Sequence, residues 1–305
     1  MTDVTASTGT ILLVDDIEEN IRTVLGILNT YDIIPCTSGM EALEILSEEH
    51  IDLILLDIMM PEMNGYQVCE KVRANAEWRE IPIIFLTARQ DEDSIEKAYD
   101  VGAHDYVTKP FLPRELKARV EFQLKFHFTL KKLEYMASHD QMTGIYNRRR
   151  FFEIAKSLFT TSPVDSFYAI MLDIDHFKRI NDKYGHAVGD VALKEVTAAI
   201  ASVLPDDACF ARLGGEEFAI VLEQSNSREI NELAEKIRQK VEQTPIITDS
   251  TSFNCSISMG VCQNDAGYKN IDELLHAADQ ALYEAKDSGR NRSIFRGSST
   301  GHMPT

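Results

Sequence analysis

Short apolar runs alternate with longer amphipathic stretches through the first third of the chain. The apolar runs are ILLV (11–14), DIIPC (32–36), DLILL (52–56), IPIIFL (81–86) and DYV (105–107), with segments of helical length between them. Five strand–helix repeats predict an α/β fold with a five-stranded, doubly wound parallel sheet. Functional side chains of such sheets gather at the carboxyl ends of the strands.

Charged and polar residues follow several of these predicted strands. Asp15 and Asp16 end the first strand, Asp57 ends the third, Thr87 ends the fourth and Lys109 follows the fifth. Carboxylate oxygens suit Mg²⁺, and a carboxylate beside that ion can accept a phosphoryl group. The sequence therefore predicts a phosphorylation site at this edge, with Thr87 and Lys109 holding the phosphoryl oxygens.

The motifs VDD, LLDIMMP, LTA and TKP, in that order, resemble the receiver domain of bacterial two-component response regulators. The resemblance implies a phosphoacceptor, ligands for one Mg²⁺, a phosphate contact and a switch pair that reorients on phosphorylation. Asp57 is the implied phosphoacceptor, and Asp15, Asp16 and Asp57 are the implied Mg²⁺ ligands. Lys109 is the implied phosphate contact, and Thr87 and Tyr106 form the implied switch pair. It also implies a partner that supplies the phosphoryl group, a histidine kinase or another phosphodonor.

A long helix is predicted to follow, because Pro113 fits a first helical turn and no Gly or Pro occurs again before His139. Apolar residues recur along it at spacings of 4, 3, 4 and 3. That heptad seam favours a two-stranded coiled coil, which would make this segment both a linker and a homodimer contact. The alternative is a single amphipathic helix lying on its own domain. The seam residues are Phe122, Phe126, Thr129, Leu133 and Met136.

The second half has another pattern, with a buried strand at 168–175 and a hairpin of 209–213 and 217–222. Helices are expected at 192–204, 227–243 and 271–287, and a further strand at about 255–262, which together predict an α+β domain. Gly214-Gly215 is expected to form the hairpin turn. Asp173 and Glu216 can share Mg²⁺ if their strands pair, whereas Asp175 and Asp182 are expected only to cap or solvate a short helix.

Four motifs of this half, DQMTGIYNRRRF, DIDHFKRINDKYGHAVGD, RLGGEEF and AKDSGRN, resemble the GGDEF domain of diguanylate cyclases, in a GGEEF variant. The resemblance implies a nucleotide-cyclase-like fold. It also implies condensation of two GTP molecules to cyclic di-GMP and pyrophosphate across a dimer of these domains.

By the same resemblance, two Mg²⁺ ions lie near each GTP, and Glu216 assists deprotonation of the attacking 3′-hydroxyl. Lys178 stabilises charge at the transferring phosphate. The implied metal ligands are Asp173, the carbonyl of Ile174, Glu216 and Glu217. The implied substrate contacts are Asn181 and Asp190 to guanine, His186 in the same stretch, and Lys286 and Arg290 to the outer phosphates.

One segment departs from the family pattern. Many diguanylate cyclases carry R-x-x-D just before the turn as a product-binding inhibitory site. This chain has Pro205-Asp206-Asp207-Ala208 there, so both required side chains are absent. Weak or no feedback inhibition through that site is expected.

The composition of the chain argues against several classes of function. A net charge of −18 argues against nucleic-acid binding, and it means that an anionic substrate needs local cations or a metal. The five cysteines form no C-x-x-C pair, so they are expected to be reduced core thiols. Neither a membrane-spanning apolar run nor a secretory signal is found, which favours the cytoplasm.

The expected organisation is a disordered tail (1–9), a receiver domain (10–115), a helical linker (116–138), a GGDEF domain (139–296) and a second disordered tail (297–305). Two other functions stay open. The second domain can be a non-catalytic module that binds GTP and signals through a partner. The protein can also be a phosphorelay or scaffold that works through its receiver. Intact Asp173, Glu216, Lys178 and Asn181 argue against the first of these.

Overall fold

The computed structural model describes residues 9–88, 92–224, 226–248, 251–265 and 267–297. Residues 1–8 and 298–305, which make up most of the two predicted tails, lie outside the described residues. The chain divides into two compact units, Met1–Leu133 and Glu134–Thr305. None of the helices in the described ranges is long and apolar enough to cross a membrane.

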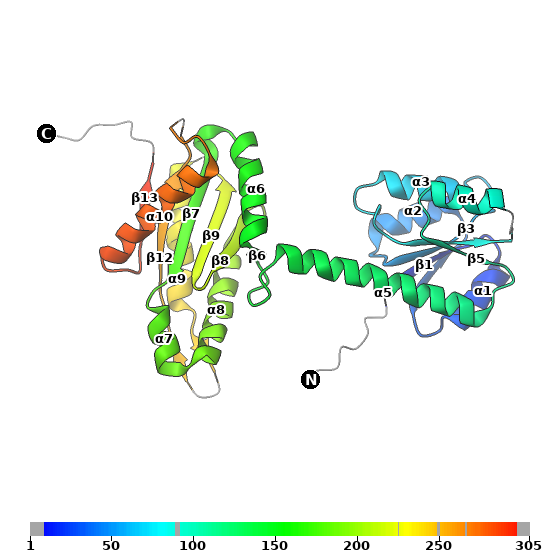
Figure 1. The fold of residues 1–305 in the computed structure, drawn as a ribbon, viewed down its shortest axis with the longest axis horizontal. Coiled ribbons are helices and arrows are strands. Elements are labelled where there is room, and N and C mark those ends of the chain that lie inside the picture. The colour runs from blue at the N-terminus through cyan, green and yellow to red at the C-terminus, as the bar shows by residue number, and fades with distance from the viewer. Residues whose placement is uncertain (1–8, 89–91, 225, 249–250, 266, 298–305) are drawn as a thin grey trace. The chain divides into compact units, whose positions relative to one another are not determined.

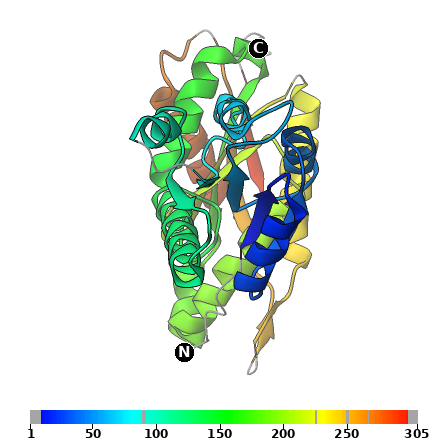
Figure 2. The same ribbon diagram turned by 90° about the vertical axis from the view of Figure 1, so that its right-hand side faces the viewer.

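The first unit is a five-stranded parallel sheet in the order β2-β1-β3-β4-β5, with helices on both faces (Figures 1 and 2). Its core has two layers, one packed against α2, α3 and α4 and one packed against α1 and α5. The predicted doubly wound α/β fold is therefore confirmed. The elements are β1 (Thr10–Val14), α1 (Glu18–Ile27), β2 (Asp32–Cys36), α2 (Gly39–Glu48), β3 (Leu53–Asp57), α3 (Gly65–Ala74), β4 (Ile83–Thr87), α4 (Glu92–Asp100), β5 (Asp105–Thr108) and α5 (Pro113–Ser138).

The central strands β3 and β4 are buried along their whole length, because helices cover both faces of the sheet. This explains why they appear in the sequence as continuous apolar runs rather than as alternating ones. The parallel register pairs Asp57 with Leu86 and Thr87 with Thr108. The polar residues that end these strands therefore meet at one edge of the sheet.

The second unit is built on a six-stranded mixed sheet in the order β13-β12-β7-β9-β8-β6. Helices α7, α8 and α9 pack on one face, and α6 and α10 pack on the other. The predicted α+β class is confirmed (Figure 1). The elements are β6 (Tyr146–Asn147), α6 (Arg148–Thr161), a 3₁₀ turn (Val164–Ser166), β7 (Phe167–Ile174), α7 (Phe177–Tyr184), α8 (His186–Ala201), β8 (Cys209–Gly214), β9 (Glu217–Glu223), α9 (Ser227–Gln243), β10 (Ile246–Ile247), β11 (Ser252–Phe253), β12 (Ile257–Gln263), α10 (Ile271–Asp287) and β13 (Ser293–Arg296).

The hairpin turn differs from the prediction by one residue. Gly214 still pairs with Glu217 as the last residue of β8, so the two turn residues are Gly215 and Glu216 rather than the two glycines. The cause is a register shift between Arg212 and Gly214, which moves the turn one position along the chain. Glu216 therefore lies in the turn itself, whereas Glu217 begins β9.

Gly260 of β12 sets how closely α10 approaches the sheet. A Cβ atom at this position would lie 2.0 Å from the carbonyl oxygen of Ala278 and 2.2 Å from the backbone nitrogen of Leu282. Only glycine permits this contact. The close packing fixes the height of α10 on the sheet, and with it the position of Lys286 in the last turn of the helix.

Candidate functional sites

Three carboxylates meet at the carboxyl edge of the receiver sheet, as predicted from the ends of its strands. One ligand oxygen from each of Asp15, Asp16 and Asp57 lies within 4.8 Å of the others. Asp15 and Asp57 are buried and Asp16 is exposed. Oxygen donors of this kind, open to solvent on one side, fit a Mg²⁺ ion that keeps several of its waters.

Lys109 bridges two of these carboxylates. Its Nζ lies 2.7 Å from Oδ2 of Asp15 and 2.9 Å from Oδ2 of Asp57. Burial raises the pKa of Asp57, the Lys109 ammonium lowers it, and the negative charge of Asp15 raises it again. Lys109 also donates its backbone N–H to the carbonyl of Thr87 at 2.7 Å, so the ends of β4 and β5 are tied together beside Asp57.

The two predicted switch residues lie on neighbouring strands. Thr87 is buried at the end of β4. Tyr106 of β5 is half-buried, with the Arg119 guanidinium 5.7 Å from its ring centre and the Tyr99 ring packed edge-on at 6.3 Å. Tyr106 thus contacts both α4 and α5, the helices beside the edge strand.

A second acidic site forms where β7 ends beside the hairpin turn. In the antiparallel pairing of β7 with β9, Asp173 lies opposite Glu217, and the backbone N–H of Ile174 donates to the carbonyl of Glu216 at 3.4 Å. Residues some forty positions apart are therefore neighbours, as expected if Asp173 and Glu216 act together.

The buried carboxylate of Asp173 is the centre of this site. Burial raises its pKa, Lys286 lowers it through an ion pair of 2.8 Å, and the charges of Glu216 and Glu217 raise it. Glu216 is half-buried and Glu217 is exposed. Within the described residues, the carboxylates at this site are not as close together as those of the receiver. The donor set of Asp173, the Ile174 carbonyl and the turn glutamates nevertheless has the hard oxygen ligands that suit Mg²⁺.

Helices α7 and α8 carry four more of the residues predicted to act on the substrate. Lys178 and Asn181 lie on α7, and His186 and Asp190 lie in the first turns of α8. A Cβ on Gly189 would lie 1.9 Å from Oδ1 of Asn181, so the amide rests against α8 next to Asp190. Asn181 therefore lies against the residue that precedes Asp190 in α8. Lys178, His186 and Asp190 have exposed side chains.

Arg290 lies just beyond α10. Its backbone N–H donates to the carbonyl of Ala285 at 3.0 Å, and its Nη1 donates to the carbonyl of Lys286 at 3.3 Å. Lys286 in the last turn of α10 and Arg290 just beyond the helix are thus linked by a side-chain hydrogen bond. Lys286 differs from the expectation in one respect, because its ammonium is paired with Asp173 rather than free for a phosphate.

The expected role of Asp175 as a cap or a solvated charge is wrong. The side chain is buried and accepts hydrogen bonds from Ser256, Ser258 and the backbone of Asn291. The burial follows from its place just beyond β7, next to the chain that leads into β12. Asp175 lies in the DID motif of the second half and Asn291 lies in the GRN motif. Membership of these motifs was the only feature of the sequence that pointed to a role for either residue.

The end of α5 is anchored to the start of the second domain. The carbonyl of Ala137 accepts from Nδ2 of Asn147 at 2.9 Å and from Nη2 of Arg149 at 2.8 Å. Asn147 also caps α6 by accepting the backbone N–H of Arg150. The basic NRRR stretch therefore serves as a junction between α5 and α6.

Comparison with known protein families gives two matches. The family described as "Diguanylate cyclase, GGDEF domain" matches residues 137–292, and "Response regulator receiver domain" matches residues 11–121. These ranges contain all the site residues described above.

Among individual proteins, "Response regulator PleD" of Caulobacter vibrioides is 30% identical over 94% of this chain and 65% of its own length. "Diguanylate cyclase A" of Treponema denticola is 37% identical over 52% of this chain and 44% of its own length. The chain thus spans less than two thirds of these curated relatives. Among solved structures, the coiled coil and GGDEF domain of DgcB from Caulobacter crescentus, in complex with c-di-GMP, is 26% identical with a TM-score of 0.55. That match covers 60% of this chain and 97% of the DgcB chain.

Proposed function

Because this chain belongs to the GGDEF family of diguanylate cyclases and carries a response-regulator receiver domain ahead of the GGDEF domain, we propose that it converts two GTP molecules into cyclic di-GMP and pyrophosphate under the control of receiver phosphorylation. The observation that carries the proposal is the β7–β9 pairing, which brings Asp173 beside the turn that bears Glu216. Lys286, one of the implied phosphate contacts, is paired with Asp173.

The chain's own residues divide the work of nucleotidyl transfer. Asp173, the Ile174 carbonyl and Glu216 would hold Mg²⁺, with Glu217 as a further ligand, and the bound ion neutralises charge on the phosphates. Glu216 assists removal of the proton from the attacking 3′-hydroxyl, and Lys178 stabilises charge at the transferring phosphate. Transfer of this kind depends mainly on positioning and charge neutralisation.

The remaining contacts hold the nucleotide. Asn181 of α7 would supply an amide and Asp190 of α8 a carboxylate, which suits the mixture of acceptors and donors on the guanine edge. Lys286 and Arg290 would grip the outer phosphates, and His186 lies at the start of the same helix as Asp190. A phosphate that draws Lys286 away would leave Asp173 free to ligate the metal.

The active form is proposed to be a dimer. Each GGDEF domain has one GTP site, so two domains must face each other for the two 3′-hydroxyls to attack reciprocally. The structure supports a contact along α5, because Phe122, Phe126 and Leu133 of the predicted seam are each about half exposed or more. Thr129 and Met136 are exposed on the same helix. An exposed apolar stripe on a helix favours pairing with a second helix.

Phosphorylation of Asp57 is proposed to act through α5. A phosphoryl group would add negative charge where Lys109 now pairs with Asp57, and Thr87 and Tyr106 would respond to it. Helix α5 packs on the sheet through Leu116 and Val120. A rearrangement at the β4–β5 edge would therefore move α5 and the seam that it carries.

Product feedback is proposed to be weak. Residues 205–208 lie in the loop between α8 and β8, where Pro205 and Ala208 occupy the positions of the arginine and the aspartate of R-x-x-D. A binding isotherm with cyclic di-GMP tests this. Tight, stoichiometric binding that is lost on changing residues 205–208 would show that the loop is a product site after all.

The decisive experiment is incubation with GTP and Mg²⁺, followed by analysis of the products. Cyclic di-GMP and pyrophosphate are expected, and they should disappear in Glu216→Gln. GTP that binds but is not converted would instead indicate a non-catalytic module. Initial rates with and without beryllofluoride, a phosphoryl mimic, test the control by the receiver; equal rates would indicate constitutive activity.

A further inference from the structure

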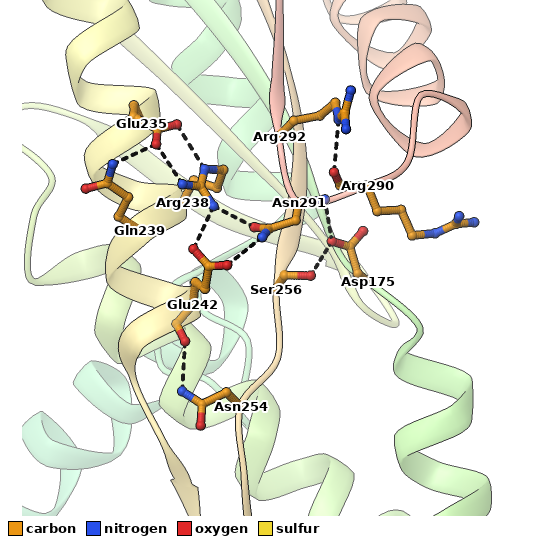
Figure 3. Close-up of polar contacts among 10 residues, drawn as sticks. All are labelled: Asp175, Glu235, Arg238, Gln239, Glu242, Asn254, Ser256, Arg290, Asn291 and Arg292. Carbon is orange, nitrogen blue, oxygen red and sulfur yellow. Dashed lines mark hydrogen bonds and ion pairs between the residues drawn. The ribbon is translucent and has the colours of Figure 1, made fainter.

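A buried carboxylate holds the chain that follows α10. Oδ2 of Asp175 accepts the hydroxyl of Ser256 at 2.6 Å and the backbone N–H of Asn291 at 3.0 Å (Figure 3). Its Oδ1 accepts the hydroxyl of Ser258 at 2.6 Å. The backbone N–H of Asp175 in turn donates to the carbonyl of Ser256 at 2.9 Å. Both carboxylate oxygens and the backbone N–H of Asp175 therefore have hydrogen-bond partners. One of these partners, Asn291, is 116 residues away in the sequence.

The side chain of Asn291 is held from the other direction by α9. Its Oδ1 accepts from Nη1 of Arg238 at 2.8 Å, and its Nδ2 donates to Oε1 of Glu242 at 2.7 Å. Arg238 is itself fixed by two hydrogen bonds to Glu235 and one to Glu242 (Figure 3). These bonds raise the pKa of Arg238 and lower the pKa values of both glutamates, so the cluster stays charged at neutral pH.

These contacts hold a backbone that is unfavourable on its own. Gly289, Arg290 and Asn291 have φ angles of 113°, 64° and 48°. Two successive non-glycine residues with left-handed φ persist only where the surroundings impose them. In Figure 3 the side chain of Arg290 extends away from the Arg238 cluster.

We propose that Asp175 and Asn291 are positioning residues that lock the turn after α10, so that Arg290 and Lys286 are held ready for the outer phosphates of the nucleotide. This inference rests on the proposed function. Its physical basis is that Asp173 and Asp175 hold the same segment at two points. Asp173 pairs with Lys286 before the turn, and Asp175 binds the backbone of Asn291 within it. Loss of the hydrogen bond between Asp175 and the backbone of Asn291 lets the left-handed turn relax. The Arg290 side chain is then no longer held in one orientation.

The experiment compares two nucleotides that differ only in the outer phosphates. Affinities of the full chain for GMP and for a GTP analogue with an α,β-methylene bridge, which cannot react, are measured calorimetrically in Mg²⁺. Asp175→Asn and Asn291→Ala should weaken binding of the analogue at least about tenfold, with GMP affinity unchanged. Asn291→Gly should have a smaller effect than Asn291→Ala, because glycine adopts the positive φ without strain.

Glu232→Gln is the matched control, because Glu232 also pairs with an arginine of α9, Arg228, at 2.9 Å but lies outside this cluster. Melting temperatures identify any variant that fails to fold. If Asp175→Asn does not fold, the comparison of Asn291→Ala with Asn291→Gly still tests the proposal. Folded variants with the same ratio of analogue to GMP affinity as the unmodified protein would overturn the positioning role alone. Failure of the unmodified protein to bind the analogue would overturn the proposed function as well.

Discussion

Lys109 neutralises two buried carboxylates, so its removal should destabilise the receiver strongly. The substitution Lys109→Met keeps a chain of similar length but leaves Asp15 and Asp57 without the cation now 2.7 and 2.9 Å away. Breaking a buried ion pair by removing one partner costs about 3–5 kcal/mol. That is a large part of the roughly 5–15 kcal/mol that stabilises a typical domain.

Urea unfolding followed by the fluorescence of Trp78 measures this loss. The chain has a single tryptophan, and it lies in the receiver unit, so the signal reports that unit alone. A loss of about 4 kcal/mol at a slope near 2 kcal/mol per molar should lower the midpoint by about 2 M urea. Lys117→Met, which removes an exposed lysine of α5, should change stability by less than about 0.5 kcal/mol.

The loss should also depend on pH and on Mg²⁺. Without Lys109, the already raised pKa of Asp57 rises further above its value in the unfolded chain. The resulting destabilisation is full above the folded pKa and disappears as pH falls through it, so the variant should recover stability on acidification. Millimolar Mg²⁺ should also stabilise it, since an ion bound only by the folded state favours that state. A loss below about 1 kcal/mol that is the same at neutral and acidic pH would refute the reasoning, because it would mean that the carboxylates do not need the cation.

Three further predictions concern the GGDEF domain and α5. Glu216→Gln should lower turnover at least about a hundredfold and Glu217→Gln should lower it less; the reverse order in product assays would show that the two roles are exchanged. Phe126→Glu puts a charge on the exposed stripe of α5, so sedimentation should show monomers with little cyclase activity but an unchanged receiver melting temperature, whereas an intact dimer would exclude this seam. The kcat/KM for GTP should rise with pH through the raised pKa of Asp173, because metal binding needs the carboxylate. Since Lys286 lowers that pKa, Lys286→Met should move the rise to higher pH, and a profile that stays in place would exclude Asp173 as the titrating group.

Local pattern was sufficient to predict most elements of both units. The predicted helices at 227–243 and 271–287 coincide with α9 and α10, because both are amphipathic segments bounded by polar residues that cap them. Asn226 and Asn270 supply those caps. The short β13 and the helix α6 were not predicted. β13 has only four residues and depends on parallel pairing with β12, which a local pattern does not reveal.

Motif residues such as Asp57, Asp173 and Glu216 were also identifiable from the chain alone, because their chemistry and order are specific. The residues that these motif residues contact could not be identified from the chain. The ion pair of Lys286 with Asp173 depends on α10 settling closely over Gly260.

The two folds and the acidic residues of both sites were predictable from the chain, since periodicity and residue chemistry are local properties. Three features were not predictable: the position of Glu217 opposite Asp173, the hairpin turn at Gly215-Glu216, and the burial of Asp175. Each of these results comes from packing between segments far apart in the chain. Spacing along the sequence carries no information about which distant backbone a side chain will meet, so these contacts appear only once the sheet has assembled.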